Sequence, residues 1–240
     1  MSEQDDRLGN QLLARFPSDV YRQIASHLEP IELNFGQTLF QVNFPYKYVY
    51  FPTTAVLSLL LPFANGSKTE LGAIGSKGMF DLSLCLRHQY TIYQAVVLVK
   101  GRALKLDSHR LKFECDRNFQ SHKILLEYTQ ARLNETSYLA ACKSHHRIAQ
   151  QLARWLLSVS DCAQQDSLNF THQNIAEILG VRRASITQAA NAFQATDTIR
   201  YNRGRIVILD RTRLESFACE CYRKIAREIH RSAFKGCVSS

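Results

Sequence analysis

Residues 170–209 constrain the fold more than any other segment, because two helical patterns and a basic hairpin pattern follow one another without interruption. Thr171 is a good N-cap, since its hydroxyl can accept a hydrogen bond from a free amide of the first turn. Apolar residues then recur at helical spacing as far as Leu179. Gly180 follows, and a glycine there can adopt the left-handed conformation that ends a helix. These signals predict a short helix that ends in a tight turn.

A second helix and a hairpin are predicted directly after this turn. Apolar residues resume at Val181 and continue at helical spacing to Phe193. Two strand-like runs, 199–201 and 205–209, then flank Asn202-Arg203-Gly204, which is typical of a hairpin connection. Helix, turn, helix and hairpin in this order indicate a winged helix-turn-helix, which places its second helix in a DNA major groove.

The polar side chains of this segment suit DNA. Arginine can contact guanine with two hydrogen bonds and glutamine can do so with adenine, at about 1–3 kcal/mol of discrimination for each pair. We expect base contacts from four residues near the start of the second helix: Arg182, Arg183, Ser185 and Gln188. We expect backbone contacts, which carry no direct sequence information, from Thr171, Thr187, Arg200, Arg203 and Arg205. The alternative is an exposed basic helix in an unrelated fold, but the ordered pattern favours DNA binding.

Charge is concentrated in the C-terminal part of the chain. The formal net charge is +9, yet residues 1–142 hold 15 Lys and Arg against 13 Asp and Glu, whereas residues 143–240 hold 15 against 8. Such asymmetry indicates a nucleic-acid-binding half. The sequence contains no stretch of 18 or more apolar residues and so predicts no membrane span. The acidic N-terminus lacks the features of a signal peptide. We therefore expect a cytoplasmic protein.

The N-terminal part has the pattern of a small β-domain. Apolar residues between Leu12 and Ile31 fit one or two short helices. After Glu32, short apolar runs alternate with turn residues, which predicts a β-barrel or β-roll. Asn65-Gly66 between two such runs is a strong hairpin signal.

Three motifs resemble one widespread branch of the Crp–Fnr superfamily of bacterial transcription regulators. They are GVRRASIT at 180–187, IRYNRGRIVILDRTRLE at 199–215 and CECY at 219–222. The resemblance implies an α+β fold: a cyclic-nucleotide-binding-like β-roll over 1–115, a dimerisation helix over 116–142 and a winged helix-turn-helix domain over 143–240. Ala184 and Gln188 stand where the best-known members carry glutamate and arginine, so the DNA sequence read by those members is not carried over.

The resemblance also locates a candidate effector pocket. The segment that matches the cyclic-nucleotide cassette supplies Gly78, Phe80, Asp81 and Ser83, with Tyr93 beyond it. Phe80 replaces a glycine that leaves room for the ligand, and no arginine lies between Tyr90 and Val96 to neutralise a phosphate. Because burying an unpaired phosphate is costly, we expect cyclic AMP and cyclic GMP to bind poorly, which leaves another effector or none.

The helix over 116–142 is the candidate dimer interface, since the matching helix of Crp–Fnr proteins pairs with its twin. Its apolar face predicts an interface of four residues: Leu125, Tyr128, Arg132 and Leu139. Arg132 and Glu135 make the stripe imperfect, and the alternative is a helix packed on its own barrel. In the following helix we expect Trp155 to belong to the core of the DNA-binding domain. The last helix, predicted over 211–234, is expected to pack on that domain or its linker.

We expect no metal and no cofactor. The seven cysteines are odd in number and scattered, which argues against a disulfide framework. Only Cys219 and Cys221 are close, and two ligands do not make a zinc site; a redox role for these two remains open. No cysteine precedes Cys85, which argues against the iron–sulfur cluster of oxygen-sensing Crp–Fnr branches. None of His88, His109, His122, His145 and His146 shows a ligand spacing with a second group on one helix face.

These patterns predict a homodimeric transcription regulator that binds a pseudo-palindromic operator. The expected partners are double-stranded DNA, a second copy of the chain, RNA polymerase and an unknown small-molecule effector, with no membrane. The alternative is an effector-binding protein whose DNA-binding domain is vestigial. No G-x-S-x-G motif, Walker loop, HExxH motif or dinucleotide fingerprint occurs, so an enzyme is not expected.

Overall fold

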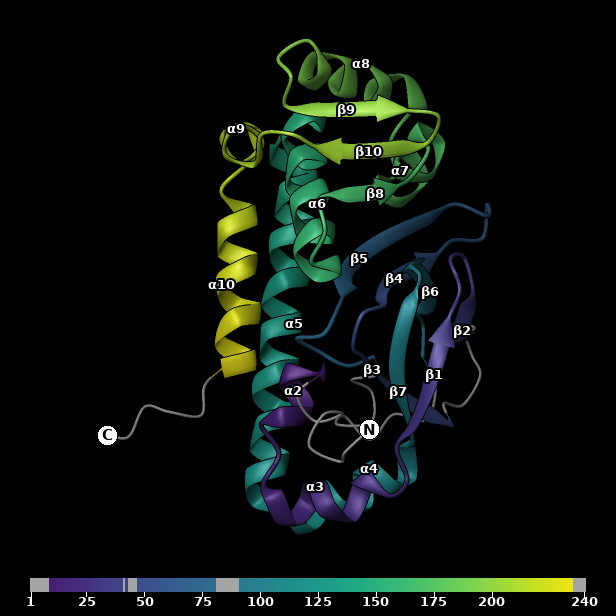
Figure 1. The fold of residues 1–240 in the computed structure, drawn as a ribbon, viewed down its shortest axis with the longest axis vertical. Coiled ribbons are helices and arrows are strands. Elements are labelled where there is room, and N and C mark those ends of the chain that lie inside the picture. The colour runs from purple at the N-terminus through teal and green to yellow at the C-terminus, as the bar shows by residue number, and fades with distance from the viewer. Residues whose placement is uncertain (1–8, 41, 43–46, 81–90, 235–240) are drawn as a thin grey trace, which may run out of the picture.

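The computed structural model describes residues 9–40, 42, 47–80 and 91–234. A β-roll, a long helix and a C-terminal domain follow one another along the chain (Figure 1). Two short helices, α2 (Gln11–Ala14) and α3 (Ser18–Ala25), precede the roll, and Pro17 is the N-cap of the second. Both helices were expected from the sequence.

Two antiparallel sheets form the β-roll. One has the order β1-β7-β3 and the other β2-β6-β4-β5. Their bounds are β1 (Glu29–Leu33), β2 (Thr38–Phe40), β3 (Tyr48–Pro52), β4 (Val56–Pro62), β5 (Lys68–Ile74), β6 (Gln94–Val99) and β7 (Gly101–Asp107). The hairpin expected at Asn65-Gly66 joins β4 to β5. The sequence did not predict β1, because Ile31 was assigned to the preceding helical pattern. It also did not predict β2, because a strand of three residues has no measurable alternation.

Helix α4 (Ser108–Arg117) leads into α5 (Phe119–His145), which runs along the molecule beside the roll. The side chain of Asn118 accepts a hydrogen bond from the Ser121 amide at 2.9 Å and caps α5. The Tyr128 hydroxyl donates to the Met79 carbonyl at 2.9 Å and accepts from the Met79 amide at 3.0 Å. These contacts fasten α5 to the roll near the end of β5.

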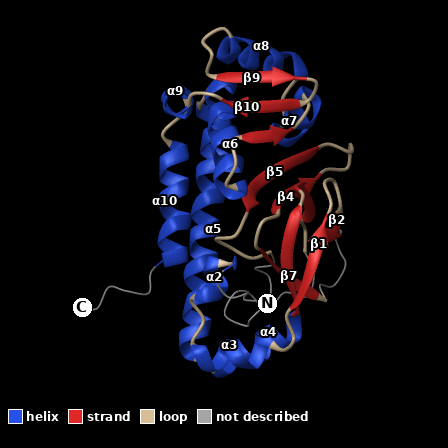
Figure 2. Cartoon of the chain, in the orientation of Figure 1, coloured by secondary structure: helices blue, strands red, loops and turns tan. Residues whose placement is uncertain are grey.

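The C-terminal domain contains a three-stranded sheet of order β8-β10-β9 among helices (Figure 2). Its elements are α6 (Ile148–Ala163), β8 (Ser167–Asn169), α7 (His172–Leu179), α8 (Arg183–Gln194), β9 (Ile199–Asn202), β10 (Arg205–Ile208), α9 (Arg211–Phe217) and α10 (Cys221–Phe234). Trp155 is buried in its core, as expected, with its ring 5.1 Å from that of Phe170. Where one terminal helix was expected, extended backbone at Ala218 separates α9 from α10. Helix α10 then packs along α5.

The C-terminal domain rests on the β-roll through a buried polar contact. The Trp155 indole N–H donates to Glu70 Oε2 at 2.9 Å, and the Ser58 hydroxyl donates to Glu70 Oε1 at 2.8 Å. Burial raises the pKa of the Glu70 carboxyl, against the opposing effect of these hydrogen bonds and of the Arg154 charge. One carboxyl therefore joins β4, β5 and α6.

The four residues predicted for a dimer interface lie inside the chain. Leu125 and Tyr128 are buried under the β-roll, and Leu139 is buried against α10. The Arg132 side chain is 5% exposed and pairs with Glu135. The expected face therefore packs on the protein's own domains, which was the alternative for this helix, because the roll and α10 cover it from two sides.

Candidate nucleic-acid interface

The turn between α7 and α8 has the geometry predicted from the sequence. Thr171 Oγ1 accepts from the Asn174 amide at 3.1 Å, and Asn174 Oδ1 accepts from the Thr171 amide at 3.1 Å, which confirms the predicted N-cap. Gly180 ends α7 with φ +69 and ψ +37, the left-handed conformation that glycine adopts without strain. The turn directs α8 across α7 with its polar side outward.

The outer side of α8 is polar and accessible. Ile186, Ala190 and Phe193 are buried beneath the helix. Five residues line a shallow, open depression on its outer side: Arg183, Ala184, Thr187, Gln188 and Asn191. Arg182 is exposed and Ser185 partly exposed at the start of the helix. Of the four candidate base contacts, Arg183 and Gln188 thus share this surface, and Arg182 and Ser185 lie beside it in the first turn. Asn191, which was not predicted as a DNA contact, extends the surface by one turn.

Thr187 also has a role within the protein. Its hydroxyl donates to the Arg183 carbonyl at 3.1 Å and lies 3.0 Å from His172 Nδ1. The His172 ring stacks on Tyr201 with 4.0 Å between ring centroids, which links α7 to β9. Burial, and secondarily the Arg183 charge, lower the pKa of His172. No pattern in the sequence predicts this buried histidine, because its partners lie 15 and 29 positions away.

The hairpin places arginines beside α8. Asn202 pairs with Arg205, so the connection consists of Arg203 and Gly204 alone, with φ of +46 and +84. Two consecutive positive φ values define the type I′ turn that suits a twisted hairpin. Arg200 and Arg203 are exposed, whereas the Arg205 Nε–H donates to the Ser167 hydroxyl at 2.9 Å. Within the described part of the chain, the wing therefore offers two guanidinium groups that make no hydrogen bond or ion pair and one that is partly engaged.

The candidate effector residues that the structure describes, Gly78, Phe80 and Tyr93, do not line one pocket. Asp81 and Ser83 lie outside the described residues. The Phe80 ring is buried and stacks on Phe40 with centroids 5.0 Å apart, so aromatic side chains fill this part of the roll. The backbone N–H of half-buried Tyr93 donates to the Thr91 hydroxyl at 3.0 Å. Of the three described candidates, Gly78 lines the cavity described next, whereas Phe80 and Tyr93 do not.

A cavity of about 90 Å³ lies between β5, α5, α6 and α10. Arg132, Glu135 and Arg154 line it. Arg132 Nη2 and Arg154 Nε are buried there without a hydrogen-bond partner among the described residues. The sequence did not predict this cavity, because four separate elements enclose it.

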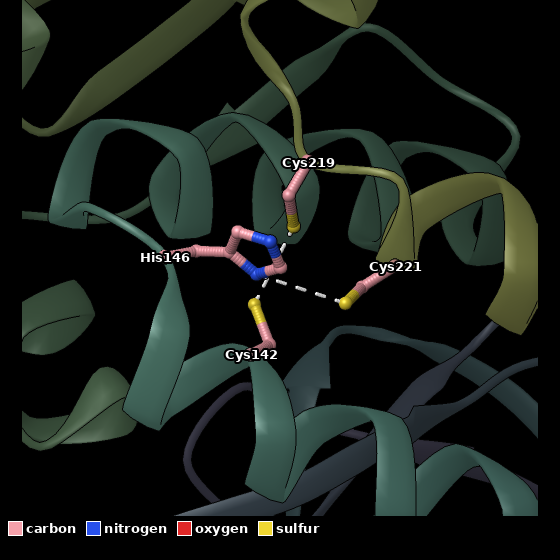
Figure 3. Close-up of side chains that lie close together, drawn as sticks. All are labelled: Cys142, His146, Cys219 and Cys221. Atoms are coloured by element: carbon pink, nitrogen blue, oxygen red, sulfur yellow. Dashed lines mark hydrogen bonds between the residues drawn. The ribbon is translucent and has the colours of Figure 1, made fainter.

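Four metal-ligating side chains meet where α5 ends. Cys219 and Cys221 lie beside Cys142 and His146, with the ligand atoms of all four within 4.8 Å of one another (Figure 3). The expectation of no metal site rested on Cys219 and Cys221 as an isolated pair and on His146 having no second ligand on its helix face. The structure overturns both premises, because Cys142 lies one helical turn before His146 at the end of α5. Cys142 and His146 lie more than 70 positions upstream, and only the packing of α10 on α5 brings them there.

The described structure contains no helix that is both long enough and apolar enough to cross a membrane. No curated protein sequence matches the chain significantly. The family model of the Crp-like helix-turn-helix domain matches residues 150–217, the segment that carries α7, α8 and the wing.

Residues 150–217 therefore form a Crp-like helix-turn-helix domain, as the sequence resemblance implied.

Solved structures of Crp–Fnr regulators share the fold over most of this chain. A Crp/Fnr-family transcriptional regulator from Eubacterium rectale superposes with a TM-score of 0.70 at 19% identity, over 88% of this chain and 98% of that one. FixK2 from Bradyrhizobium japonicum gives 0.68 at 12% identity, over 80% and 98%. CLP from Xanthomonas campestris, described as a c-di-GMP-responsive global regulator, gives 0.63 at 14% identity, over 80% and 99%. The chain is a Crp/Fnr-like transcription regulator with a helix-turn-helix DNA-binding domain.

Proposed function

We propose that this Crp/Fnr-like regulator acts as a homodimer that reads a pseudo-palindromic operator with α8. The exposed polar surface of α8, from Arg182 to Gln188, is the observation that carries the proposal. This surface lies on a buried apolar core, so its side chains are held on a rigid element rather than on a loop. The wing arginines lie next to it and supply contacts to the DNA backbone.

The first prediction separates base contacts from backbone contacts. Arg183→Ala should cost about 1–3 kcal/mol on the operator and relax specificity at one base pair. Arg203→Asn should weaken binding to all sequences similarly and reduce the salt slope by about one. Asparagine is the suitable replacement because it tolerates the positive φ of Arg203. Mobility-shift titrations at several salt concentrations measure both effects.

Arg22→Ala is the matched control for these variants. Arg22 is an exposed arginine on α3, at the opposite end of the molecule from α8 (Figure 1). This variant should bind as the wild type does. The proposal fails if wild-type protein selects no sequence from a random pool, or if Arg22→Ala weakens binding as much as Arg203→Asn.

The dimer would form along the outer face of α5. Phe119, Leu126, Leu133 and Ala140 are exposed there and recur every seven residues, with exposed fractions of 84%, 46% and 60% for the first three. Apolar residues at one position of each heptad would form part of the seam along which two parallel helices pair. Two subunits paired in this way would present two copies of α8 to half-sites about one helical turn apart.

The second prediction tests this face. Leu126→Glu combined with Leu133→Glu should convert the dimer to a monomer in analytical ultracentrifugation, because four like charges would meet along the pair. Affinity for a full palindrome should fall sharply, while affinity for a single half-site should not change. Phe63→Glu is the control, since Phe63 is 50% exposed on the β4–β5 hairpin. Persistence of the dimer in the double variant would exclude this face.

The β-roll does not favour a cyclic nucleotide as the effector. The rings of Phe80 and Phe40 stack inside it and occupy this part of its interior. The described α8 surface and the paired wing hairpin retain the elements that a DNA-binding domain needs. They therefore do not favour the alternative of an effector-binding protein with a vestigial DNA-binding domain.

A further inference from the structure

Cys142, His146, Cys219 and Cys221 form a compact cluster, hereafter the Cys₃His cluster. Cys142 lies in the last turn of α5 and His146 is the residue that ends this helix, one turn further on. Cys219 lies in the connection between α9 and α10, and Cys221 is the first residue of α10. Figure 3 shows the four side chains pointing toward one common point from these two segments.

The separations within the Cys₃His cluster are those of a tetrahedral metal site. Cys142 Sγ lies 3.5 Å from Cys219 Sγ, and Cys221 Sγ lies 3.8 Å from His146 Nδ1. With Zn–S bonds of about 2.3 Å and Zn–N bonds of about 2.0 Å, tetrahedral geometry separates ligand atoms by about 3.5–3.8 Å. All four ligand atoms already lie within 4.8 Å of one another, so small side-chain movements would complete the geometry.

The second nitrogen of His146 has the partner that a metal-bound histidine requires. His146 Nε2 lies 3.1 Å from Glu220 Oε2, whereas Nδ1 faces Cys221. A carboxylate that accepts the other ring N–H fixes the tautomer and turns the free nitrogen toward the metal. Glu220 stands between Cys219 and Cys221 in the sequence, so one short segment supplies two thiols and this orienting group.

The surroundings of the Cys₃His cluster suit an anionic complex. All three cysteines are buried, and Leu139 and Ile225 pack around them. Three thiolates and a divalent cation leave one net negative charge, which needs a nearby cation. The buried guanidinium of Arg154 lies beside Cys142 and supplies it. Soft sulfur ligands with one imidazole, in tetrahedral arrangement, select zinc among the common divalent ions.

We propose that the Cys₃His cluster binds one structural Zn²⁺ ion, with ligands Cys142 Sγ, His146 Nδ1, Cys219 Sγ and Cys221 Sγ. Four protein ligands close the coordination shell, which is the arrangement of structural rather than catalytic zinc. The ion joins the end of α5 to the start of α10, at the point where the chain passes from α5 into α6. It therefore fixes the junction between the long helix and the DNA-binding domain. Zinc binding displaces thiol protons, so affinity falls as the pH is lowered.

The test uses the full-length protein and needs no DNA. Protein purified under reducing conditions should contain about one zinc per chain by elemental analysis. After removal of the metal with a chelator, Co²⁺ should produce the intense visible bands of tetrahedral coordination with thiolate charge transfer, and Zn²⁺ should displace it. Added Zn²⁺ should also raise the thermal unfolding midpoint of the stripped protein, because the ion binds only the folded chain.

Variants assign the ligands. Glu220→Gln removes only the orienting carboxylate and should weaken zinc binding about 10–100-fold. Cys142→Ala and Cys221→Ala should each weaken zinc binding further and lose the cobalt bands. Cys162→Ala, a cysteine outside the Cys₃His cluster, should retain one zinc. Should Cys142→Ala fail to fold, His146→Gln provides the same readout from the partly exposed side of the site.

Three results would overturn the proposal. The first is a cobalt complex without thiolate bands, and the second is full zinc content in Cys142→Ala or Cys221→Ala. The third is a Cys142–Cys219 disulfide in protein alkylated at lysis, which would assign these thiols to redox chemistry instead.

Discussion

Trp155→Ala should lower the free energy of unfolding by about 3–5 kcal/mol, the range for removal of a fully buried tryptophan. The indole is 1% exposed and packs against Phe170 in the C-terminal core. The variant also removes the hydrogen bond to Glu70 on β5 and so loosens the C-terminal domain from the β-roll. Guanidinium denaturation followed by circular dichroism measures the loss, since the variant lacks the chain's one tryptophan fluorophore.

Trp155→Phe separates packing from the hydrogen bond. It keeps most of the ring but leaves Glu70 Oε2 buried without the indole donor, which should cost about 1–3 kcal/mol. In Glu70→Leu the carboxyl is absent, so Trp155→Phe on that background should cost less than on the wild type. Equal costs on both backgrounds would show that the hydrogen bond contributes nothing.

Local patterns predicted most of the fold. The N-cap at Thr171, the left-handed Gly180 and the hairpin around Gly204 follow from preferences of single residues, and the structure confirms all three. The break at Ala218 between α9 and α10 was not predicted, because no glycine or proline marks it. The chain turns there so that α10 can pack on α5, which is a tertiary effect.

The candidate sites were predictable only where one element carries them. Arg183 and Gln188 lie on a single helix, so helical spacing alone places them on one surface. The Cys₃His cluster joins Cys142 to Cys219 across 77 positions, and spacing rules cannot detect such a pair. The predicted dimer face had the same weakness: periodicity shows that Leu125 and Leu139 share an apolar side but not what covers that side.

Arg132 and Glu135 provide the second large prediction. Their side chains are 5% and 7% exposed, and the guanidinium donates both to the carboxylate and to the Ala73 carbonyl, the latter at 3.2 Å. Burial raises the pKa of Glu135, and the Arg132 charge opposes this effect. Glu135→Leu alone should cost about 3–5 kcal/mol, because it leaves a buried, uncompensated guanidinium.

The double variant Arg132→Met/Glu135→Leu should recover most of that loss, because an apolar pair of similar volume often matches a buried ion pair in stability. Denaturation midpoints of the two single variants and the double variant give the coupling energy, and additive losses would contradict a paired interaction. Sedimentation adds an independent check. Because the pair faces β5 inside each chain, whereas Leu126 and Leu133 lie on the exposed face of α5, the double variant should remain a dimer. If the double variant were monomeric, Arg132 would belong to the subunit interface, as the helical pattern predicted.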